Sequence, residues 1–429
     1  MHILGWGYAR PTVLLTGILT LLTGILSACV SLSPTPPHIV EGLRQSPEAW
    51  VVGAPKGLAD PVVLNNKNFI WTIAPMPAGQ EGAAFSRMTQ KHVLASLWTL
   101  ETEGGQTRGQ LRCELPLNET AFDIEGMAFM PGGDILLAAS RNGKLYAVDV
   151  KTCKQLREVQ VGRPLVCIAI DATGGRVALG AADGSVGVYA WPFPEGGLEE
   201  GGLWEGLHAD EVRALAFDKE GHLYSGGFDK RIVQWLLKEG EGGSRFILEK
   251  QKEFGFEGYV NDFSLDAMGK TLGIALSEAK AERTLEIHLR EKRGEKEPVR
   301  PWDGGVLLNI ETGEQKAFFA HRGTVTTAGI SPDGQMLATG GFDKRILLHR
   351  QGEKTWERAL GWSVRRLRFS PDGRYVWAAA WTPQNAQGKA GKPSALAYEL
   401  LFGEDAFIHA TPPLPPSAED IAPAEEVAP

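Results

Sequence analysis

The sequence predicts an all-β protein, a single β-propeller of seven four-stranded antiparallel blades. Two observations carry this prediction. The 429 residues include 52 Gly and 26 Pro spread along the chain, as expected where many short strands are joined by tight turns. The heptapeptide GGFDKRI also occurs twice, at 226–232 and at 340–346, inside longer segments of alternating apolar residues. A repeated strand-and-turn unit therefore fills most of the chain.

Two copies of this unit align almost position by position, one starting at His208 and the other at His321. Each reads as a strand of alternating apolar residues, a polar turn with Gly, a second strand, the GGFD turn and a third strand. Weaker copies begin at Gly126, Leu165 and Val364. Counting units gives seven, starting near residues 59, 122, 162, 208, 257, 321 and 361. Repeats of about 40 to 45 residues with this internal order are typical of propeller blades.

The spacing of the two heptapeptides predicts an insertion between them. Two blades would separate the copies by about 80 to 90 residues, whereas the distance from residue 226 to residue 340 is 114. The excess of roughly 30 residues corresponds to the charged segment 277–304, in which TLEIHL alternates like a strand. We expect a projecting hairpin or a short charged helix, acting either as a solvated excursion without a role or as an arm that contacts a partner.

Both ends of the chain differ in composition from the repeats. Arg10 is the one charged side chain before an apolar run that is shorter than the ~20 residues of a spanning helix, which is the layout of a secretory signal peptide. We assign 1–28 to the signal peptide, 29–58 to a tether and 59–410 to the propeller. The Pro- and acid-rich segment 411–429 cannot bury a core and is expected to be a disordered tail.

The residues LSAC, from Leu26 to Cys29, resemble the lipobox of bacterial lipoproteins, whose Cys thiol is alkylated by a diacylglyceryl group. The resemblance implies that Cys29 carries lipid chains that hold the protein on a membrane. Val30 stands where that family places Asp for retention in the inner membrane, which implies an outer-membrane protein facing the periplasm. The alternatives are an ordinary signal peptide cleaved near Ala28 and an uncleaved anchor.

Three further cysteines bear on the compartment and the core. In an oxidising compartment an odd number of thiols allows at most one internal disulfide here. Cys167 lies in the apolar run LVCIAI and is expected to be a small core residue. Whether Cys113 pairs with Cys153 is left open by the sequence.

The repeats resemble those of the WD40 family over about residues 59–410. The residues at the positions of that family's structural tetrad are His208, Ser225, Asp229 and Trp235 in the fourth unit, and His321, Thr339 and Asp343 in the sixth. His349 stands where the sixth unit would have Trp. The resemblance implies that these side chains form hydrogen bonds that hold the turn between the second and third strands, because backbone N–H groups there lack ladder partners.

An aromatic residue precedes each of the two turn Asp residues, and two cations follow. The family geometry directs this turn to the top face of the propeller, where an exposed aromatic beside Lys and Arg is a residue type that anchors protein interfaces. The candidates for partner binding are Phe228, Lys230, Arg231, Phe342, Lys344 and Arg345. The alternative is that each Phe packs on the loop of the next blade and the cations only solvate the rim.

Charge and motifs exclude several classes of function. The formal net charge of −8 provides no basic field for a nucleic acid. The chain contains no CxxCH, HExxH, GxSxG or P-loop sequence and no convincing metal spacing, so we expect no catalytic residue, cofactor or metal. Sites built in a central channel from distant blades have no spacing signature, however.

We therefore expect a membrane-tethered, extracytoplasmic scaffold that binds unidentified envelope proteins and is not an enzyme. The alternative is a propeller enzyme or small-ligand binder that uses the central channel. A factor in outer-membrane protein assembly is a third reading, which rests on fold analogy alone. The outer strand of the last blade is expected either from AWVVGAP near Trp50 or from DAFIHA near Phe407.

Overall fold

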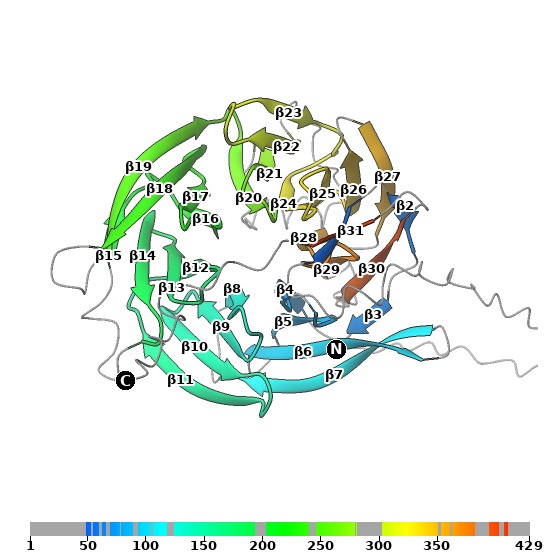
Figure 1. Cartoon of the computed structure of the whole chain (residues 1–429), viewed down its shortest axis with the longest axis horizontal. Coiled ribbons are helices and arrows are strands. Elements are labelled where there is room, and N and C mark those ends of the chain that lie inside the picture. Colours follow the sequence, from blue (N-terminus) through cyan, green and yellow to red (C-terminus); the bar gives the residue numbers. More distant parts are fainter. Residues whose placement is uncertain are drawn as a thin grey trace, which may run out of the picture. The chain divides into compact units, whose positions relative to one another are not determined.

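The computed structural model describes the chain between residues 49 and 410. Gaps within this range fall at 53–54, 60–61, 66–68, 78, 89–92, 104–105, 118–123, 194–202, 240–245, 279, 281–302, 351–352, 361–362, 382–393 and 403–406. Every regular element of the described residues is a β-strand. Seven antiparallel blades form a ring around a central channel, which confirms the predicted seven-bladed propeller (Figure 1).

The first six blades each take four consecutive strands, numbered from the channel outward in blades 1 to 6. Blades 1 and 2 contain β4 (Phe69–Pro75), β5 (Gly82–Met88), β6 (Val93–Glu103), β7 (Gln106–Pro116), β8 (Ile124–Phe129), β9 (Ile135–Ser140), β10 (Lys144–Asp149) and β11 (Lys154–Gln160). Blades 3 and 4 contain β12 (Leu165–Ile170), β13 (Arg176–Ala181), β14 (Ser185–Ala190), β15 (Leu203–Gly206), β16 (Val212–Phe217), β17 (Leu223–Gly227), β18 (Arg231–Glu239) and β19 (Phe246–Gly255). Blades 5 and 6 contain β20 (Tyr259–Leu265), β21 (Thr271–Ser277), β22 (Gly304–Asn309), β23 (Gln315–Phe318), β24 (Val325–Ile330), β25 (Met336–Gly341), β26 (Arg345–Arg350) and β27 (Glu353–Ala359).

Blade 7 closes the ring with strands from both ends of the described chain. Its inner strands are β28 (Ser363–Phe369), β29 (Tyr375–Trp381) and β30 (Ser394–Phe402). The outer edge of β30 pairs with β2 (Pro55–Leu58) and with β3 (Val62–Asn65), so the N-terminal side of the chain supplies this position in two pieces.

Both segments that we expected to compete for this position do something else. AWVV forms β1 (Ala49–Val52) and FIHA forms β31 (Phe407–Ala410), and these two strands pair with each other in a separate sheet. Residues 49–52 and 55–58 were also assigned to the tether, but they form strands β1 and β2. Strand β2 is held by pairing with β30, which is far away in the sequence. Its four residues are too few to show a strand periodicity.

The core consists of seven clusters of buried apolar side chains, each lying between two neighbouring blades. The cluster between blades 7 and 1, for example, joins Trp377 to Ile70 and Phe85. Because the inner strands are covered on both faces by adjacent blades, they are buried almost throughout, as in β24. The outer strands have fewer neighbours and remain largely exposed, as in β11 and β19.

Covalent linkage also joins two blades. Cys113 on β7 and Cys153 in the turn after β10 form a disulfide, which answers the question that the sequence left open. Cys167 on β12 is buried in the core, as predicted.

Several predicted segments lie outside the described residues. The insertion 277–304 leaves blade 5 between β21 and β22, and its part from 281 to 302 falls in a gap. The signal peptide, Cys29 and the tail at 411–429 also lie outside the described part of the chain.

Candidate functional site

Two parts of the propeller carry polar side chains in a defined arrangement. One is the set of turns between the second and third strands of the blades, on the face that we call the top face. The other is the central channel. The turns contain the residues singled out from the sequence, and the channel contains residues that the sequence analysis did not identify.

The top-face turn of blade 4 is held by a continuous hydrogen-bonded chain. His208 Nδ1 lies 2.9 Å from Asp229 Oδ2, and His208 Nε2 lies 2.7 Å from Ser225 Oγ. The indole N–H of Trp235 donates to the same Ser225 oxygen over 2.8 Å. Burial opposes ionisation of Asp229, but its bonds to His208 and Arg231 outweigh burial and lower the pKa of this carboxyl to about 2. The carboxylate is therefore occupied in holding the turn.

The same turn in blade 6 uses three of the four side chains. His321 Nδ1 lies 3.0 Å from Asp343 Oδ2, and His321 Nε2 lies 2.8 Å from Thr339 Oγ1. His349, at the fourth position, stacks on Phe318 with ring centroids 5.1 Å apart, and its Nε2 is buried without a hydrogen-bond partner. Burial, followed by the neighbouring His321, lowers the pKa of His349 to about 4, so the ring is neutral.

The glycine pair of the repeated heptapeptide is required by close backbone approach. A Cβ atom on Gly227 would lie 1.9 Å from the carbonyl oxygen of Glu211, and one on Gly341 would lie 2.5 Å from that of Thr324. Any other residue would push the second strand away from the first strand of the same blade. The second Gly of each pair therefore belongs to blade construction.

The two turn aromatics do not form an exposed patch. Phe228 is 1% exposed and packs edge to face against Tyr259 on β20, with ring centroids 6.2 Å apart. Phe342 is 7% exposed and lies beneath the guanidinium of Arg365 on β28, 5.9 Å from its ring centroid. The exposure predicted for these rings is wrong, because each ring gains about 2 kcal/mol or more by burial against the following blade. Packing on the next blade was the alternative kept open for them.

The four cations of the heptapeptides divide into two kinds. Arg231 donates to Asp229 and to the carbonyl oxygen of Leu207. Arg345 donates to the carbonyl oxygen of Ala320 over 2.8 Å and pairs with Glu357. Both arginines are therefore part of the turn framework.

The lysines of these turns have an unusual backbone. Lys230 and Lys344 both have φ of 65°, in the left-handed region that favours glycine. Blades 2 and 3 place Gly143 and Gly184 at the corresponding position, each with φ of 83°. Lys230 Nζ bonds to the carbonyl oxygen of Glu257 over 2.8 Å, whereas Lys344 is exposed.

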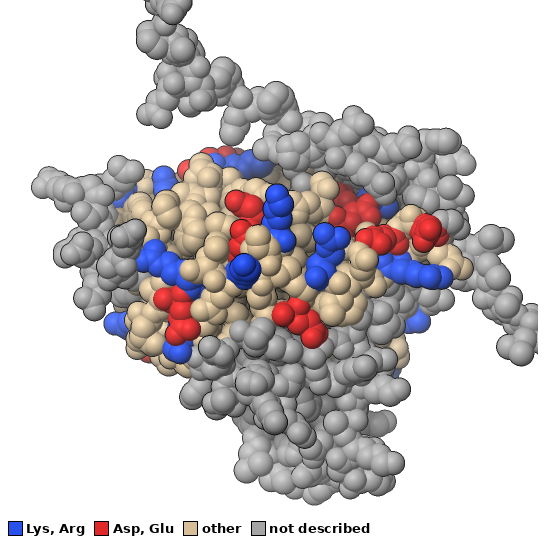
Figure 2. Space-filling model, turned by 90° about the horizontal axis from the view of Figure 1, so that it is seen from below, with Lys and Arg blue, Asp and Glu red and all other residues tan. Residues whose placement is uncertain are grey.

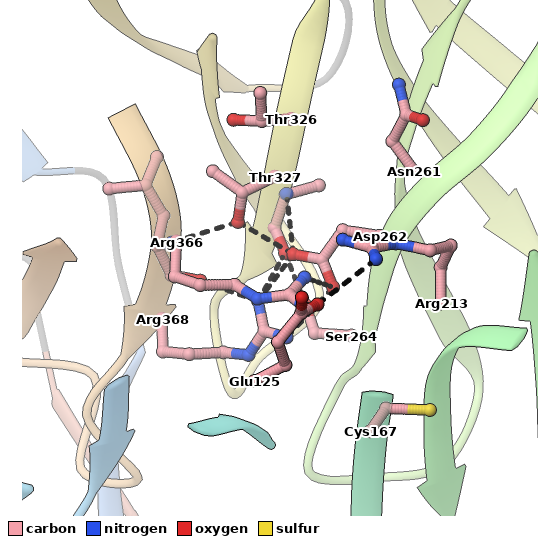
Figure 3. Close-up of polar contacts among 12 residues, drawn as sticks. Glu125, Cys167, Arg213, Asn261, Asp262, Ser264, Thr326, Thr327, Arg366 and Arg368 are labelled. Atoms are coloured by element: carbon pink, nitrogen blue, oxygen red, sulfur yellow. Dashed lines mark hydrogen bonds and ion pairs between the residues drawn. The ribbon is translucent and has the colours of Figure 1, made fainter. Parts of the chain in front are cut away.

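The central channel contains a cluster of buried charges contributed by several blades (Figure 3). Its members are Glu125 on β8, Arg213 on β16, Asp262 on β20, and Arg366 and Arg368 on β28. Figure 3 shows the guanidiniums of Arg366 and Arg368 pointing toward Asp262 from one side, with Arg213 reaching in from the other. A cavity of about 250 Å³ adjoins these side chains.

One half of the cluster is centred on Glu125. Its carboxylate accepts from Arg141 over 2.5 Å and from Arg213 over 3.3 Å. Glu211 accepts from Arg141 over 2.7 Å and from Arg213 over 2.5 Å. Burial of Glu125 favours the neutral acid, but the charges of Arg213 and Arg141 outweigh burial and lower its pKa to about 2. The Glu125 carboxylate is therefore ionised beside the two guanidiniums.

The other half is centred on Asp262, which is fully buried. Arg368 binds both of its oxygens, over 2.7 and 2.9 Å, and Thr327 donates to Oδ2 over 2.7 Å. Arg366 Nη1 lies 3.0 Å from Oδ1 as an ion pair, but this nitrogen has no hydrogen-bond partner. Burial opposes ionisation of Asp262, and the two arginines reverse that effect and lower its pKa.

Sequence reasoning missed this cluster, although a signal was present. Charged residues interrupt strands that otherwise read as innermost and apolar, as in EVRALAF, VNDFSL and VRRLRF. A buried charge inside an inner strand requires a partner, and in a propeller the partner comes from another blade.

One further group has spacing compatible with a metal ion. Ligand atoms of Asp218, Glu220 and His222 lie within 4.8 Å of one another at the turn of blade 4. The Asp218 carboxylate is already engaged by the His222 ring over 2.9 Å and by the Tyr224 hydroxyl over 3.1 Å. These bonds account for the group as a turn structure.

The described surface mixes the two signs of charge. On the face seen in Figure 2, Lys and Arg lie among Asp and Glu, without a broad area of one sign. Ion pairs among the described residues include Lys238 on β18 with Glu249 on β19, and Lys354 with Glu357 on β27.

The ring of seven blades, with its hydrogen-bonded top-face turns, defines a seven-bladed β-propeller. The family model "WD domain, G-beta repeat" matches residues 313–350, which run from β23 of blade 5 through the first three strands of blade 6. This segment includes the second GGFDKRI and the blade 6 turn described above.

Two curated proteins show similarity to the chain. The "Periodic tryptophan protein 2 homolog" of Caenorhabditis elegans is 23% identical over 250 residues, which cover 56% of this chain and 25% of that protein. The "Eukaryotic translation initiation factor 3 subunit I" of Phaeosphaeria nodorum is 30% identical over 93 residues, covering 17% of this chain and 26% of that protein. The chain thus spans about a quarter of the length of these relatives.

Proposed function

We propose that this protein is a lipid-tethered, extracytoplasmic scaffold that binds protein partners on its top face, with Lys230 and Lys344 among the contact residues. The observation that carries this proposal is the left-handed backbone of both lysines. A side chain in this conformation costs about 1 to 2 kcal/mol, and glycine would avoid that cost. Lys230 bonds to the carbonyl oxygen of Glu257 and lies over the Tyr259 ring, 5.0 Å from its centroid, whereas Lys344 is exposed. From the strain kept at the same turn of two blades we infer that the ammonium groups also serve binding.

The fold suits such a role because the turns are held by a rigid frame. Each top-face turn of blades 4 and 6 is fixed by buried hydrogen bonds, and the ring leaves only short, protected strand edges. Lysine ammonium groups at fixed positions favour an acidic protein surface and steer its approach. The similarity to proteins with WD40-type repeats supports a binding role over catalysis.

The proposed location rests on two further observations. Disulfides persist in oxidising compartments, so the pair Cys113–Cys153 supports a site outside the cytoplasm. The LSAC sequence ending at Cys29 supports a lipid anchor. Among the described residues, no helix has the length and apolar character needed to traverse a bilayer.

The partner proposal is tested by replacing both strained lysines with glycine. Lys230→Gly with Lys344→Gly removes two ammonium groups and relieves the backbone, so we expect a melting temperature that is equal or higher together with loss of a specific partner in membrane crosslinking. The matched control removes two exposed lysines from outer strands, as Lys250→Ala with Lys316→Ala, and should keep the partner. An unchanged set of crosslinked partners in the glycine variant would refute the role of these lysines.

The anchor is tested separately with Cys29→Ser. We expect this variant to appear in the soluble fraction after cell lysis, because the lipid chains would supply the binding free energy for the membrane. Continued tight association with membranes would contradict lipidation of Cys29.

A further inference from the structure

We propose that the central channel binds a small oxyanion, a carboxylate or phosphate group carried by a small molecule, between the guanidiniums of Arg366 and Arg213. This proposal is independent of the partner-binding role, because these residues lie in the channel and not in the lysine turns.

Arg366 on β28 is buried at the channel and is the first of the two arginines at the proposed site. Its side chain is 8% exposed, and its ionic partner among the described residues is Asp262. Both oxygens of Asp262 are already engaged by Arg368, and Oδ2 also accepts from Thr327. Arg366 Nη1 is consequently buried with no acceptor in hydrogen-bonding geometry. A planar guanidinium with an unfilled Nη1 donor is suited to an oxygen of a carboxylate or phosphate.

Arg213 on β16 is the second arginine at the proposed site. Its Nη1 is held by Glu211 and Glu125, but its Nε is buried without a hydrogen-bond partner. The cavity of about 250 Å³ is lined by both Arg213 and Arg366, together with Glu125 and Arg368. Both of these arginines, each with an unfilled donor, therefore line the same cavity.

The positive and negative charges of the channel cluster are unequal in number. The linked groups comprise four guanidiniums, of Arg141, Arg213, Arg366 and Arg368, against three carboxylates, of Glu125, Glu211 and Asp262. Among these linked groups the positive charges exceed the negative by one; a further carboxylate, Asp266, lines the same cavity, and burial raises its pKa. Burial, reinforced by the charges of Arg213 and Arg368, lowers the pKa of Arg366. An uncompensated buried charge is costly, and a bound anion would remove that cost.

The size and chemistry of the channel limit what the ligand is. A cavity of about 250 Å³ is smaller than the ~300 Å³ at which drug-sized sites begin, which favours a small ligand. The one thiol that lines it, Cys167, is not reactive, because burial raises its pKa to about 12 and its Sγ lies 3.5 Å from the carbonyl oxygen of Val212. We infer binding of the anion without chemical conversion.

The test is titration of the full chain with inorganic phosphate and, separately, with acetate, in Tris chloride at constant ionic strength. Calorimetry gives the dissociation constant and thermal unfolding gives the shift in melting temperature. We expect at least one anion to bind and to raise the melting temperature, and the tighter of the two identifies the head group. Weak specific ligands have dissociation constants in the millimolar range. The proposal would be overturned if neither anion gave a heat of binding at concentrations up to about 10 mM.

Variants place the site. Arg366→Met should weaken binding at least tenfold and still fold, because Asp262 keeps Arg368 and Thr327. Arg163→Met, which removes an arginine that is 40% exposed and paired with Asp183, is the control and should bind as the wild type does. Arg366→Lys retains the charge without the fork, so it should also bind more weakly and serves if the Met variant does not fold. Equal affinity in the wild type and in a folded Arg366 variant would show that the anion binds elsewhere.

Discussion

At the scale of the residue, three members of the repeated heptapeptide have different structural roles. Its second Gly allows close backbone approach, its Asp holds the turn, and its Phe fills the boundary with the next blade. The turn backbone does not require its Lys, because Gly143 and Gly184 adopt the same conformation in blades 2 and 3. The Lys230 ammonium does contact the Glu257 carbonyl and the Tyr259 ring, whereas Lys344 is exposed.

The Asp of the blade 4 turn gives the first residue-scale prediction. Asp229→Ala removes the acceptor for His208, for the Ala209 amide and for Arg231, so we expect a loss of about 3 kcal/mol in the free energy of unfolding. Urea denaturation measures it. Asp183→Ala is the matched control at the same position of blade 3, where the side chain is 46% exposed, and should cost clearly less. Equal losses would contradict the importance of the His208 connection.

His349 gives a prediction about pH. Its pKa is about 4 in the folded protein and about 6.5 in the unfolded chain, so between these values the unfolded state binds the extra proton. The free energy of unfolding should therefore fall as pH decreases from about 6.5 to 4, by about 3 kcal/mol from this group. His349→Phe should remove that part of the pH dependence, measured by denaturation at pH 7 and pH 5, and His222→Phe should not. The idea fails if wild type and His349→Phe lose stability equally.

At the scale of the element, the inner strands and the outer strands obey different constraints. Inner strands lie between blades and tolerate charge only where another blade supplies the counter-charge, as Asp262 on β20 and Arg368 on β28 show. Outer strands lie at the rim and vary freely in polarity, as β19 does. The polarity of a strand in the sequence therefore indicates whether the strand is an inner or an outer one.

Ring closure gives the prediction at this scale. A chain that starts at residue 66 lacks β2 and β3, leaving the edge of β30 unpaired and Leu58 missing from its apolar cluster. We expect a loss of about 5 kcal/mol and a melting temperature lower by about 10 °C, compared with a chain that starts at residue 55. A synthetic peptide of residues 55–65 should restore part of the loss. Identical melting curves for the two chains would show that β2 and β3 do not close the ring.

At the scale of the whole molecule, the ring places residues from distant blades in one channel and ties the outer edges of blades 1 and 2 by a disulfide. Cys113 and Cys153 are 40 residues apart in sequence, and a cross-link of this length stabilises by about 4 kcal/mol in the chain-entropy model. Reduction with dithiothreitol should lower the melting temperature. The Cys113→Ser, Cys153→Ser double variant should start lower and show no further change with the reductant; a large additional shift in that variant would trace the effect to another thiol.

Much of this architecture is determined by the sequence alone, because a propeller repeats a local unit. The alternation of apolar residues, the turn glycines and the Asp positions act within one blade, so the number of blades and the hydrogen-bonded turns at His208 and His321 could be predicted residue by residue. The tertiary structure decided what depends on contact between blades. It closed the ring with β2 and β3, turned Phe228 and Phe342 inward, and brought Arg213, Asp262 and Arg366 together across the channel. These features join residues that are far apart in the chain. Contacts between such residues cannot be predicted from the spacing or the periodicity of the sequence.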